Sequence, residues 1–155
     1  GLSGTHTYVV TNSHTVPVQN KIKSLDEDAG TSALNWLVDR VHGRAKKYIL
    51  DKEFDVVAEA LSIDGLDRPV LLRRKHYYEV LKGLLDSQGL NWTQLTVVGD
   101  IFELDLALPL ALGGTVGLVV NPFTPEYEKA FVQAHPRGRL IDGLDEIRNF
   151  AFSSE

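Results

Sequence analysis

The stretch Leu95-Thr96-Val97-Val98-Gly99-Asp100-Ile101-Phe102-Glu103-Leu104-Asp105 decides the fold of this chain. It joins an apolar run to two aspartates, Asp100 and Asp105, which stand five residues apart. The run predicts a buried strand, so the first carboxylate falls at the carboxyl end of that strand and the second at the start of the next helix. Ligands of open α/β sheets bind at this end of the strands. Oxygen ligands alone favour a hard cation such as Mg²⁺.

Strands and helices alternate along the rest of the chain. Apolar, β-rich runs predict strands at residues 7–10, 48–50, 95–98, 115–120 and 139–141. Periodic apolar positions and end signals predict helices at 31–43, 75–89, 103–112 and 144–150, and one more that begins at 124–126. Alternation of this kind predicts an α/β fold, a single Rossmann-like domain over residues 1–155 with a mostly parallel sheet and helices on both faces. We expect the strands at 7–10, 95–98 and 115–120 to lie parallel in one sheet.

Composition narrows the class of protein. A chain of 155 residues suits one domain. Its longest apolar run, residues 104–120, is interrupted by Asp105, Pro109 and a glycine pair, so it is not a membrane span. The net charge of −5, with no basic cluster longer than residues 73–75, argues against a nucleic-acid partner. Without cysteine there are no disulfides or thiolate metal sites, and without a visible targeting segment we expect a cytoplasmic location.

Four segments together resemble the haloacid dehalogenase-like (HAD) superfamily of hydrolases. Tyr8-Val9-Val10-Thr11-Asn12-Ser13 resembles the family's strand-end threonine or serine motif, and Lys75 at a helix start resembles its lysine. Val98-Gly99-Asp100 with Asp105 resembles its acidic motif, and residues 138–147 resemble the usual HAD ending. The matches follow the order of the family, and the resemblance implies a HAD-like core.

The resemblance implies a Mg²⁺-dependent phosphatase that acts on a small phosphorylated molecule, a phosphate monoester. In the family an aspartate attacks the phosphoryl group, water hydrolyses the aspartyl-phosphate, and Mg²⁺ offsets the negative charge. Asp100 would ligate the metal, and Asp105 would support the site from the second layer of residues. The alternative for each is an ordinary structural role, a helix cap for Asp100 and a surface acid for Asp105.

The strand-end motif implies a phosphate-binding role for Thr11 and Asn12. The Thr11 hydroxyl would donate to a phosphate oxygen, with help from the backbone N–H groups of Asn12 and the residue after it. Thr-Asn-Ser is equally a good turn sequence, so a purely structural turn is the alternative.

Lys75 is the cation that the resemblance assigns to the site. It would stabilise the charge of nucleophile and phosphate as a point charge. The family often places proline after this lysine, whereas this chain has His76. Arg73 or Arg74 is therefore an alternative holder of the role, and a solvated cation at a helix start is another.

The nucleophile motif of the family, Asp-x-Asp at the end of a strand ahead of Thr11, does not occur in this sequence. Only ten residues precede Thr11, and acid pairs such as Asp26-Glu27-Asp28 follow no predicted strand. In the family the nucleophile strand lies between the strands that end at the threonine motif and at the acidic motif. We therefore expect a longer complete polypeptide, in which the strands ending at Thr11 and Asp100 do not pair with each other.

Two functions of different class follow from the sequence. One is the HAD-type phosphatase, with its nucleophile and substrate-selecting cap outside these residues. The other is a noncatalytic α/β domain that keeps the scaffold for binding or assembly. A receiver domain ranks lower, because its motifs run acids, threonine, lysine, while here the order is threonine, lysine, acids. A dehalogenase of the same superfamily is a further alternative, but the paired acids favour the metal-dependent branch.

Overall fold

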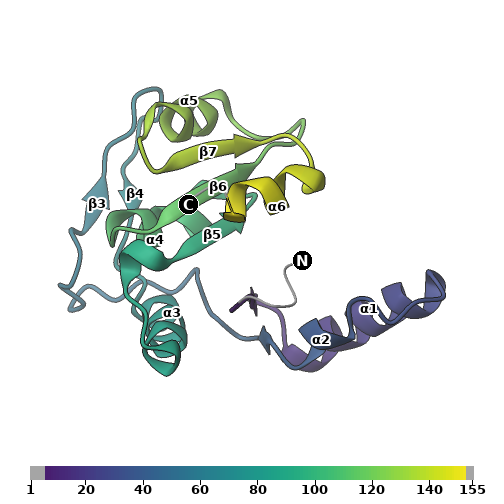
Figure 1. The fold of residues 1–155 in the computed structure, drawn as a ribbon. Coiled ribbons are helices and arrows are strands. Elements are labelled where there is room, and N and C mark those ends of the chain that lie inside the picture. The colour runs from purple at the N-terminus through teal and green to yellow at the C-terminus, as the bar shows by residue number, and fades with distance from the viewer. Residues whose placement is uncertain (1–5, 153–155) are drawn as a thin grey trace. The chain divides into compact units, whose positions relative to one another are not determined.

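The computed structural model describes residues 6–152. The chain divides into two compact units, Gly1–Lys47 and Tyr48–Glu155. Both units combine helices with small sheets, so the chain is an α/β protein (Figure 1). Within the described residues, none of the helices has the length and apolar character needed to cross a bilayer.

The first unit is built around two short parallel strands. β1 (Val9–Val10) pairs with β2 (Val41–His42). Between them the chain forms α1 (Thr15–Asp28) and α2 (Asn35–Val38), which supply the apolar side chains that the strands need for burial. The buried core of this unit is Ile22, Val38 and Val41, with Val9, Val18, Leu34 and Leu37 packed against it.

A buried aspartate fixes the connection between α1 and α2. Asp26, in the last turn of α1, is 5% exposed. Its carboxylate accepts hydrogen bonds from the Thr31 hydroxyl at 3.0 Å and from the Leu34 N–H at 2.9 Å. Hydrogen bonds to a carboxylate are stronger than those between neutral groups, so this side chain holds the loop that returns the chain to β2.

The predicted helix at residues 31–43 is wrong. The long helix of this unit is α1, and only Asn35–Val38 is helical in the predicted range. Pro17 does not prevent α1, because it stands in the first turn, where its missing N–H has no helical partner to lose. Val41 is an apolar position of β2 and not of a helix, since it pairs with Val9.

A three-stranded parallel sheet lies at the centre of the second unit. Its strands are β5 (Thr96–Gly99), β6 (Thr115–Val119) and β7 (Gly138–Ile141), in that order. Val116 and Leu118 of the middle strand are fully buried. The predicted strands at 95–98 and 115–120, and their parallel pairing, are confirmed.

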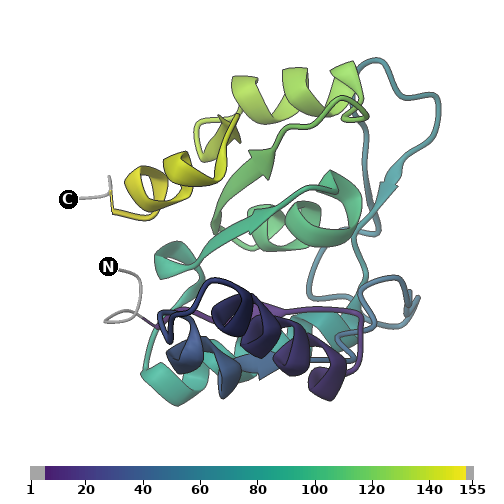
Figure 2. The ribbon, with the colours of Figure 1, turned by 90° about the vertical axis from the view of Figure 1, so that its right-hand side faces the viewer.

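Helices lie on both faces of this sheet. α4 (Ala107–Ala111) lies behind it, α6 (Leu144–Phe152) in front, and α5 (Glu126–Ala134) packs against β6 and β7 (Figure 1, Figure 2). Gly117 gives α6 room, because a Cβ there would lie 2.9 Å from Cε1 of Phe150. Close packing of this kind fixes the helix to the strand.

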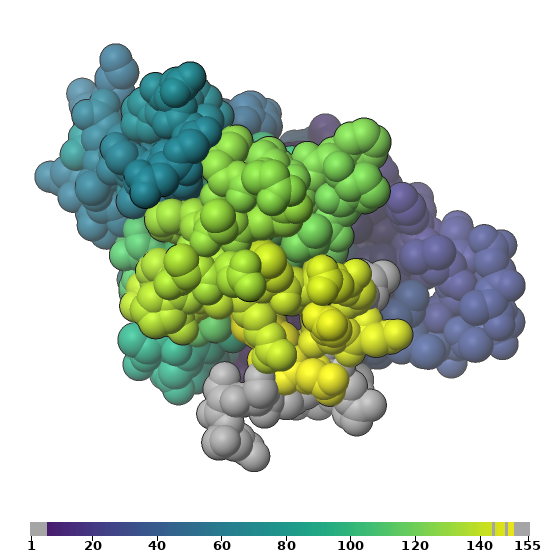
Figure 3. Space-filling model, turned by 90° about the horizontal axis from the view of Figure 1, so that it is seen from above, coloured from purple at the N-terminus to yellow at the C-terminus, as the bar shows by residue number. Residues whose placement is uncertain are grey.

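An antiparallel hairpin and a long helix precede the sheet. β3 (Ala60–Leu61) pairs with β4 (Val70–Leu71), and the loop between them lies against α5 (Figure 3). α3 (Lys75–Gln88) follows, and it ends as predicted at Gly89, whose left-handed backbone closes the helix. A 3₁₀ turn, Trp92–Gln94, then leads into β5.

Two other predictions are wrong, and a third is right about the helix but not about its type. Residues 48–50 form no strand, because no neighbouring segment pairs with them. The predicted helix at 103–112 is present but differs in type, since it begins as a π-helix, Phe102–Leu106, and becomes α-helical only in α4. β1 does not share a sheet with β5 and β6, since it pairs with β2 in a sheet of two strands. β1 and β5 do not pair among the described strands, but they belong to separate sheets and so do not flank a gap in one sheet as predicted.

Candidate functional site

The turn after β5 carries both predicted acids. Asp100 directly follows the strand and is exposed. Asp105 is half-buried and folds back on the turn, where its Oδ2 accepts the N–H of Ile101 at 3.2 Å. Gly99 permits this approach, because a Cβ at Gly99 would lie 2.6 Å from Cβ of Asp105. The turn thus presents one carboxylate to solvent and holds the other against its own backbone.

Gly99→Ala is expected to destabilise the second unit and to displace Asp105. The new methyl group would overlap the Asp105 side chain near its root, where no torsion can move it away, and such overpacking costs about 1–3 kcal/mol. The matched control is Gly83→Ala in α3, where nothing lies within 4 Å of the added Cβ. A helix gains about 0.5–1 kcal/mol from that change. The urea concentration at the midpoint of unfolding should fall for Gly99→Ala and rise for Gly83→Ala. Equal midpoints for the two variants would contradict the packing described.

The turn itself is a π-helix that is anchored from inside. Phe102 is 1% exposed, and its ring lies 5.2 Å from that of Phe131 in an edge-on arrangement. The hydroxyl of Tyr77 donates to the backbone carbonyl of Asp105 at 2.8 Å. Burial raises the pKa of Tyr77, so the hydroxyl keeps the proton that it donates. Single π-helical turns are frequent at functional sites.

The start of α3 lies beside this turn. Tyr77 belongs to the first turn of α3, whose first residue is Lys75. Lys75 is exposed, and none of the ion pairs within residues 6–152 involves it. The side chain of Arg74 is 4% exposed and pairs with Glu103, and Arg73 donates to the carbonyl of Lys52 at 2.7 Å. Of the three candidate cations, Lys75 is the exposed one.

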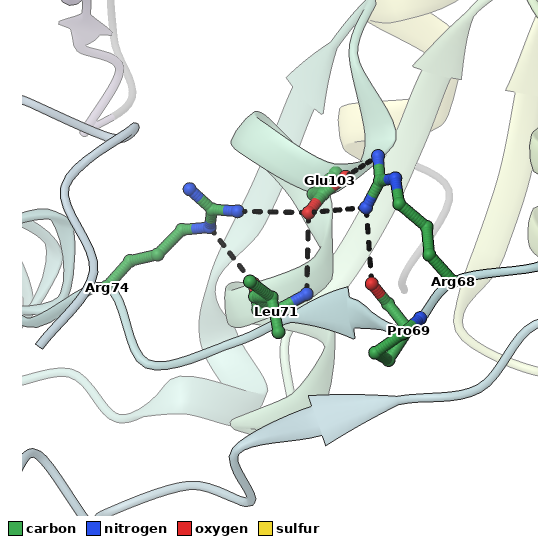
Figure 4. Close-up of polar contacts among 5 residues, drawn as sticks. All are labelled: Arg68, Pro69, Leu71, Arg74 and Glu103. Atoms are coloured by element: carbon green, nitrogen blue, oxygen red, sulfur yellow. Dashed lines mark hydrogen bonds and ion pairs between the residues drawn. The ribbon is translucent and has the colours of Figure 1, made fainter. Parts of the chain in front are cut away.

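Glu103, between the two aspartates, is the most densely bonded side chain of the turn. Its Oε2 accepts from Arg68 Nη2 at 2.6 Å, and its Oε1 accepts from Arg68 Nη1 at 3.2 Å and Arg74 Nη2 at 3.3 Å (Figure 4). The N–H of Leu71 in β4 also points to Oε1, at 3.4 Å. Burial opposes ionisation of Glu103, but the hydrogen bonds from Arg68 and Leu71 and the charges of Arg68 and Arg74 together lower its pKa.

A buried acid of α5 also contacts this turn. Glu128, in the first turn of α5, is 7% exposed. Burial raises the pKa of Glu128, the N–H of Phe102 opposes the shift, and the charges of Glu103, Asp100 and Asp105 raise the pKa further. The charges of the three acids of the turn therefore act on the buried carboxyl group of Glu128.

Thr11 and Asn12 lie in the first unit, in the turn between β1 and α1. The Thr11 hydroxyl accepts the N–H of Ser13 at 3.2 Å. The side-chain oxygen of Asn12 accepts the N–H of Lys47 at 2.7 Å. These bonds use acceptor oxygens and leave the Thr11 hydroxyl proton able to donate. Both side chains also stabilise the turn, as the structural alternative requires.

The chemistry of the acids fits a magnesium ion held by few protein ligands. In the part of the chain that the structure describes, no group of three or more histidine, cysteine, aspartate or glutamate side chains is arranged to hold a metal. Mg²⁺ is usually bound by one or two carboxylates, with water and substrate phosphate completing the octahedron. Asp100, exposed at the strand end with Asp105 behind it, matches that pattern.

The structure brings Asp100 and Asp105 into one turn and places the helix start with Lys75 beside it. Sequence reasoning missed Glu103 and Glu128. Glu103 lacked a recognisable signal, because its partner Arg68 is 35 residues away in the chain. Glu128 follows a predicted helix start, but nothing in the sequence indicated that it would be buried.

Comparison with known proteins adds no relative, since no family model, no curated protein and no solved structure matches this chain.

Proposed function

We propose that this chain is the core of a HAD-type hydrolase, a Mg²⁺-dependent phosphatase that acts on a small phosphate monoester. The observation that carries the proposal is the turn after β5. Asp100 stands exposed at the carboxyl end of a parallel strand, and Asp105 is folded against Gly99 directly behind it. Exposed carboxylates at this edge of a parallel sheet are placed where ligands of such sheets bind.

In this proposal each residue has one task. Asp100 holds Mg²⁺, and Asp105 orients the turn that presents Asp100. Lys75 stabilises the negative charge of the phosphoryl group. Thr11 and Asn12 belong to the first unit, and their phosphate-binding role stays a prediction from the sequence. Bound Mg²⁺ would offset the remaining charge of the phosphate.

The reaction requires an attacking aspartate in addition to these residues. Its carboxylate oxygen forms a bond to phosphorus, the ester P–O bond breaks, and the leaving alkoxide takes a proton from water. Water then hydrolyses the aspartyl-phosphate and releases inorganic phosphate. An added strand is compatible with the strand order, because β5 pairs only with β6 among the described strands. The proposal assigns the nucleophile to a strand from outside these residues.

The proposal is tested on the complete polypeptide with a generic aryl phosphate as substrate. Hydrolysis is expected with Mg²⁺ and should stop on addition of a chelator, returning when Mg²⁺ is restored. The physical reason is that the carboxylates alone repel a phosphate and only a cation makes the turn attractive to it. Hydrolysis that is indifferent to chelator, or absent from the complete protein, would defeat the proposal.

A noncatalytic binding or assembly domain is the second candidate. The observation that favours it is the engagement of Thr11 and Asn12 in turn hydrogen bonds of their own unit. In that case the acids after β5 would serve the fold alone, and replacing Asp100 would leave every binding property unchanged. The two candidates therefore give opposite results for the same substitution.

A further inference from the structure

We propose that Glu103 is a positioning residue that fastens the β3–β4 hairpin and the start of α3 to the acidic turn. The inference rests on the proposed function, because it concerns the placement of Asp100 and Asp105. The feature that carries it is a shared carboxylate: groups from two separate segments converge on one side chain of the turn (Figure 4).

The contacts tie three segments together. Arg68 and Leu71 come from the hairpin, and both donate to Glu103. Arg74 directly precedes α3 and donates to Glu103 Oε1, while its Nε donates to the carbonyl of Leu71 at 3.1 Å. A single carboxylate thus connects β4, the helix start that carries Lys75, and the turn that carries the aspartates.

The energetics of the contact differ on its two sides. The side chain of Arg68 is 57% exposed, so water screens its pairing with Glu103. The side chain of Arg74 is 4% exposed, and burial lowers its pKa while Glu103 opposes that shift. Loss of Glu103 takes an ion-pair partner from a buried cation, so it is expected to disturb the start of α3 more than the exposed side.

The hairpin also contacts the rest of the unit at a second place. Loss of the bonds to Glu103 can therefore be distinguished from loss of the whole hairpin. Gly65, in the loop between β3 and β4, lies against Tyr127 of α5, where an added Cβ would be 3.2 Å from the tyrosine Cβ. The hairpin therefore contacts both the turn after β5 and helix α5. Removing the bonds to Glu103 frees the hairpin from the turn and leaves the contact with α5 in place.

A merely structural ion pair would give a different outcome. Such a pair would change stability but leave the folded molecules with the same dependence on Mg²⁺. A positioning residue changes the Mg²⁺ requirement of folded molecules, because the turn that presents Asp100 and Asp105 loses its fixed geometry.

The experiment compares Glu103→Gln with wild type in the complete protein, by hydrogen exchange and by the Mg²⁺ concentration that gives half-maximal hydrolysis of an aryl phosphate. Exchange is expected to rise in residues 60–75 and in residues 99–106 together. The half-maximal Mg²⁺ concentration should rise roughly 10-fold. The matched control is Asp86→Asn, which neutralises a carboxylate that pairs with Lys82 at 2.6 Å on the exposed side of α3. It should leave both measurements unchanged.

Each outcome decides a different point. Unchanged exchange in either segment, or a raised exchange with an unaltered Mg²⁺ requirement, overturns the positioning role. If Glu103→Gln fails to fold, Arg68→Gln replaces an exposed side chain and should raise exchange in the same two segments. A wild-type protein without phosphatase activity defeats the proposed function. In that case direct titration with Mg²⁺ decides the inference, because weaker Mg²⁺ binding by Glu103→Gln supports it and equal binding overturns it.

Discussion

Asp100→Asn is expected to remove most Mg²⁺-dependent phosphatase activity of the complete protein while the protein stays folded. The side chain is exposed, so the change costs little packing. A neutral amide does not compensate a cation for its lost water as a carboxylate does, and without the cation the charge on the phosphoryl group is poorly stabilised. We expect a fall in kcat of about 100- to 1000-fold, the range for losing one electrostatic contact in an active site.

Assays of Asp100→Asn over a range of Mg²⁺ concentrations, with circular dichroism as the check on folding, measure this effect. Asp86→Asn serves as the control, since it makes the same chemical change on the surface of α3. Asp105→Asn should have the smaller effect, about 10- to 100-fold, because Asp105 acts through the turn. Full activity of Asp100→Asn would leave the acidic turn with a structural role only.

Phe102→Ala is expected to produce the largest loss of stability among single substitutions in the turn, about 3–5 kcal/mol. The ring is 1% exposed and lies against Phe131, so its removal is expected to leave a buried cavity beside that residue. Phe123→Ala removes the same ring from a position that is 92% exposed, and it should change stability by less than about 0.5 kcal/mol.

Urea denaturation of the two phenylalanine variants gives the comparison directly. A loss below about 1 kcal/mol for Phe102→Ala would mean that the turn is not anchored by its aromatic side chain. A large loss for Phe123→Ala would mean that the exposed loop after β6 is packed against something in solution.

The sheet of the second unit could be predicted because its signals are local. β5 and β6 are short apolar runs with polar residues directly after them, and a helix-length connection between such runs makes them parallel. The proximity of Asp100 and Asp105 follows from the same turn. Gly89 likewise marks the end of α3 by its backbone freedom alone.

The first unit was harder to predict, because its sequence patterns are weak and its paired strands are far apart in the chain. α1 carries a narrow apolar face, and Leu25 on the helix is 51% exposed, so the periodic pattern is incomplete. β1 and β2 have two residues each, too few for an alternating pattern. β1 and β2 pair through Val9 and Val41, and only the folding of the helical segment between them brings these two residues together.

The hydrogen bonds and ion pairs around Glu103 could not be predicted either, because they join residues that are far apart in the sequence. Arg74 is 29 residues from Glu103, and no rule of spacing links them. The exposure of Arg68 and the burial of Arg74 depend on tertiary packing. Residue types alone indicate that arginine and glutamate pair, but not which of them do.

The open edge of β5 also has a consequence for the behaviour of the protein in solution. Its outer row of backbone N–H and C=O groups has no strand partner among the described residues. The sequence there, Thr96-Val97-Val98-Gly99, contains no charge or proline, the residues by which natural sheets discourage self-association. When this edge is not covered by another segment, two copies can join edge to edge through it. Preparations in which this edge stays uncovered are therefore expected to aggregate, and Thr96→Lys, at an exposed position of the strand, is expected to oppose aggregation.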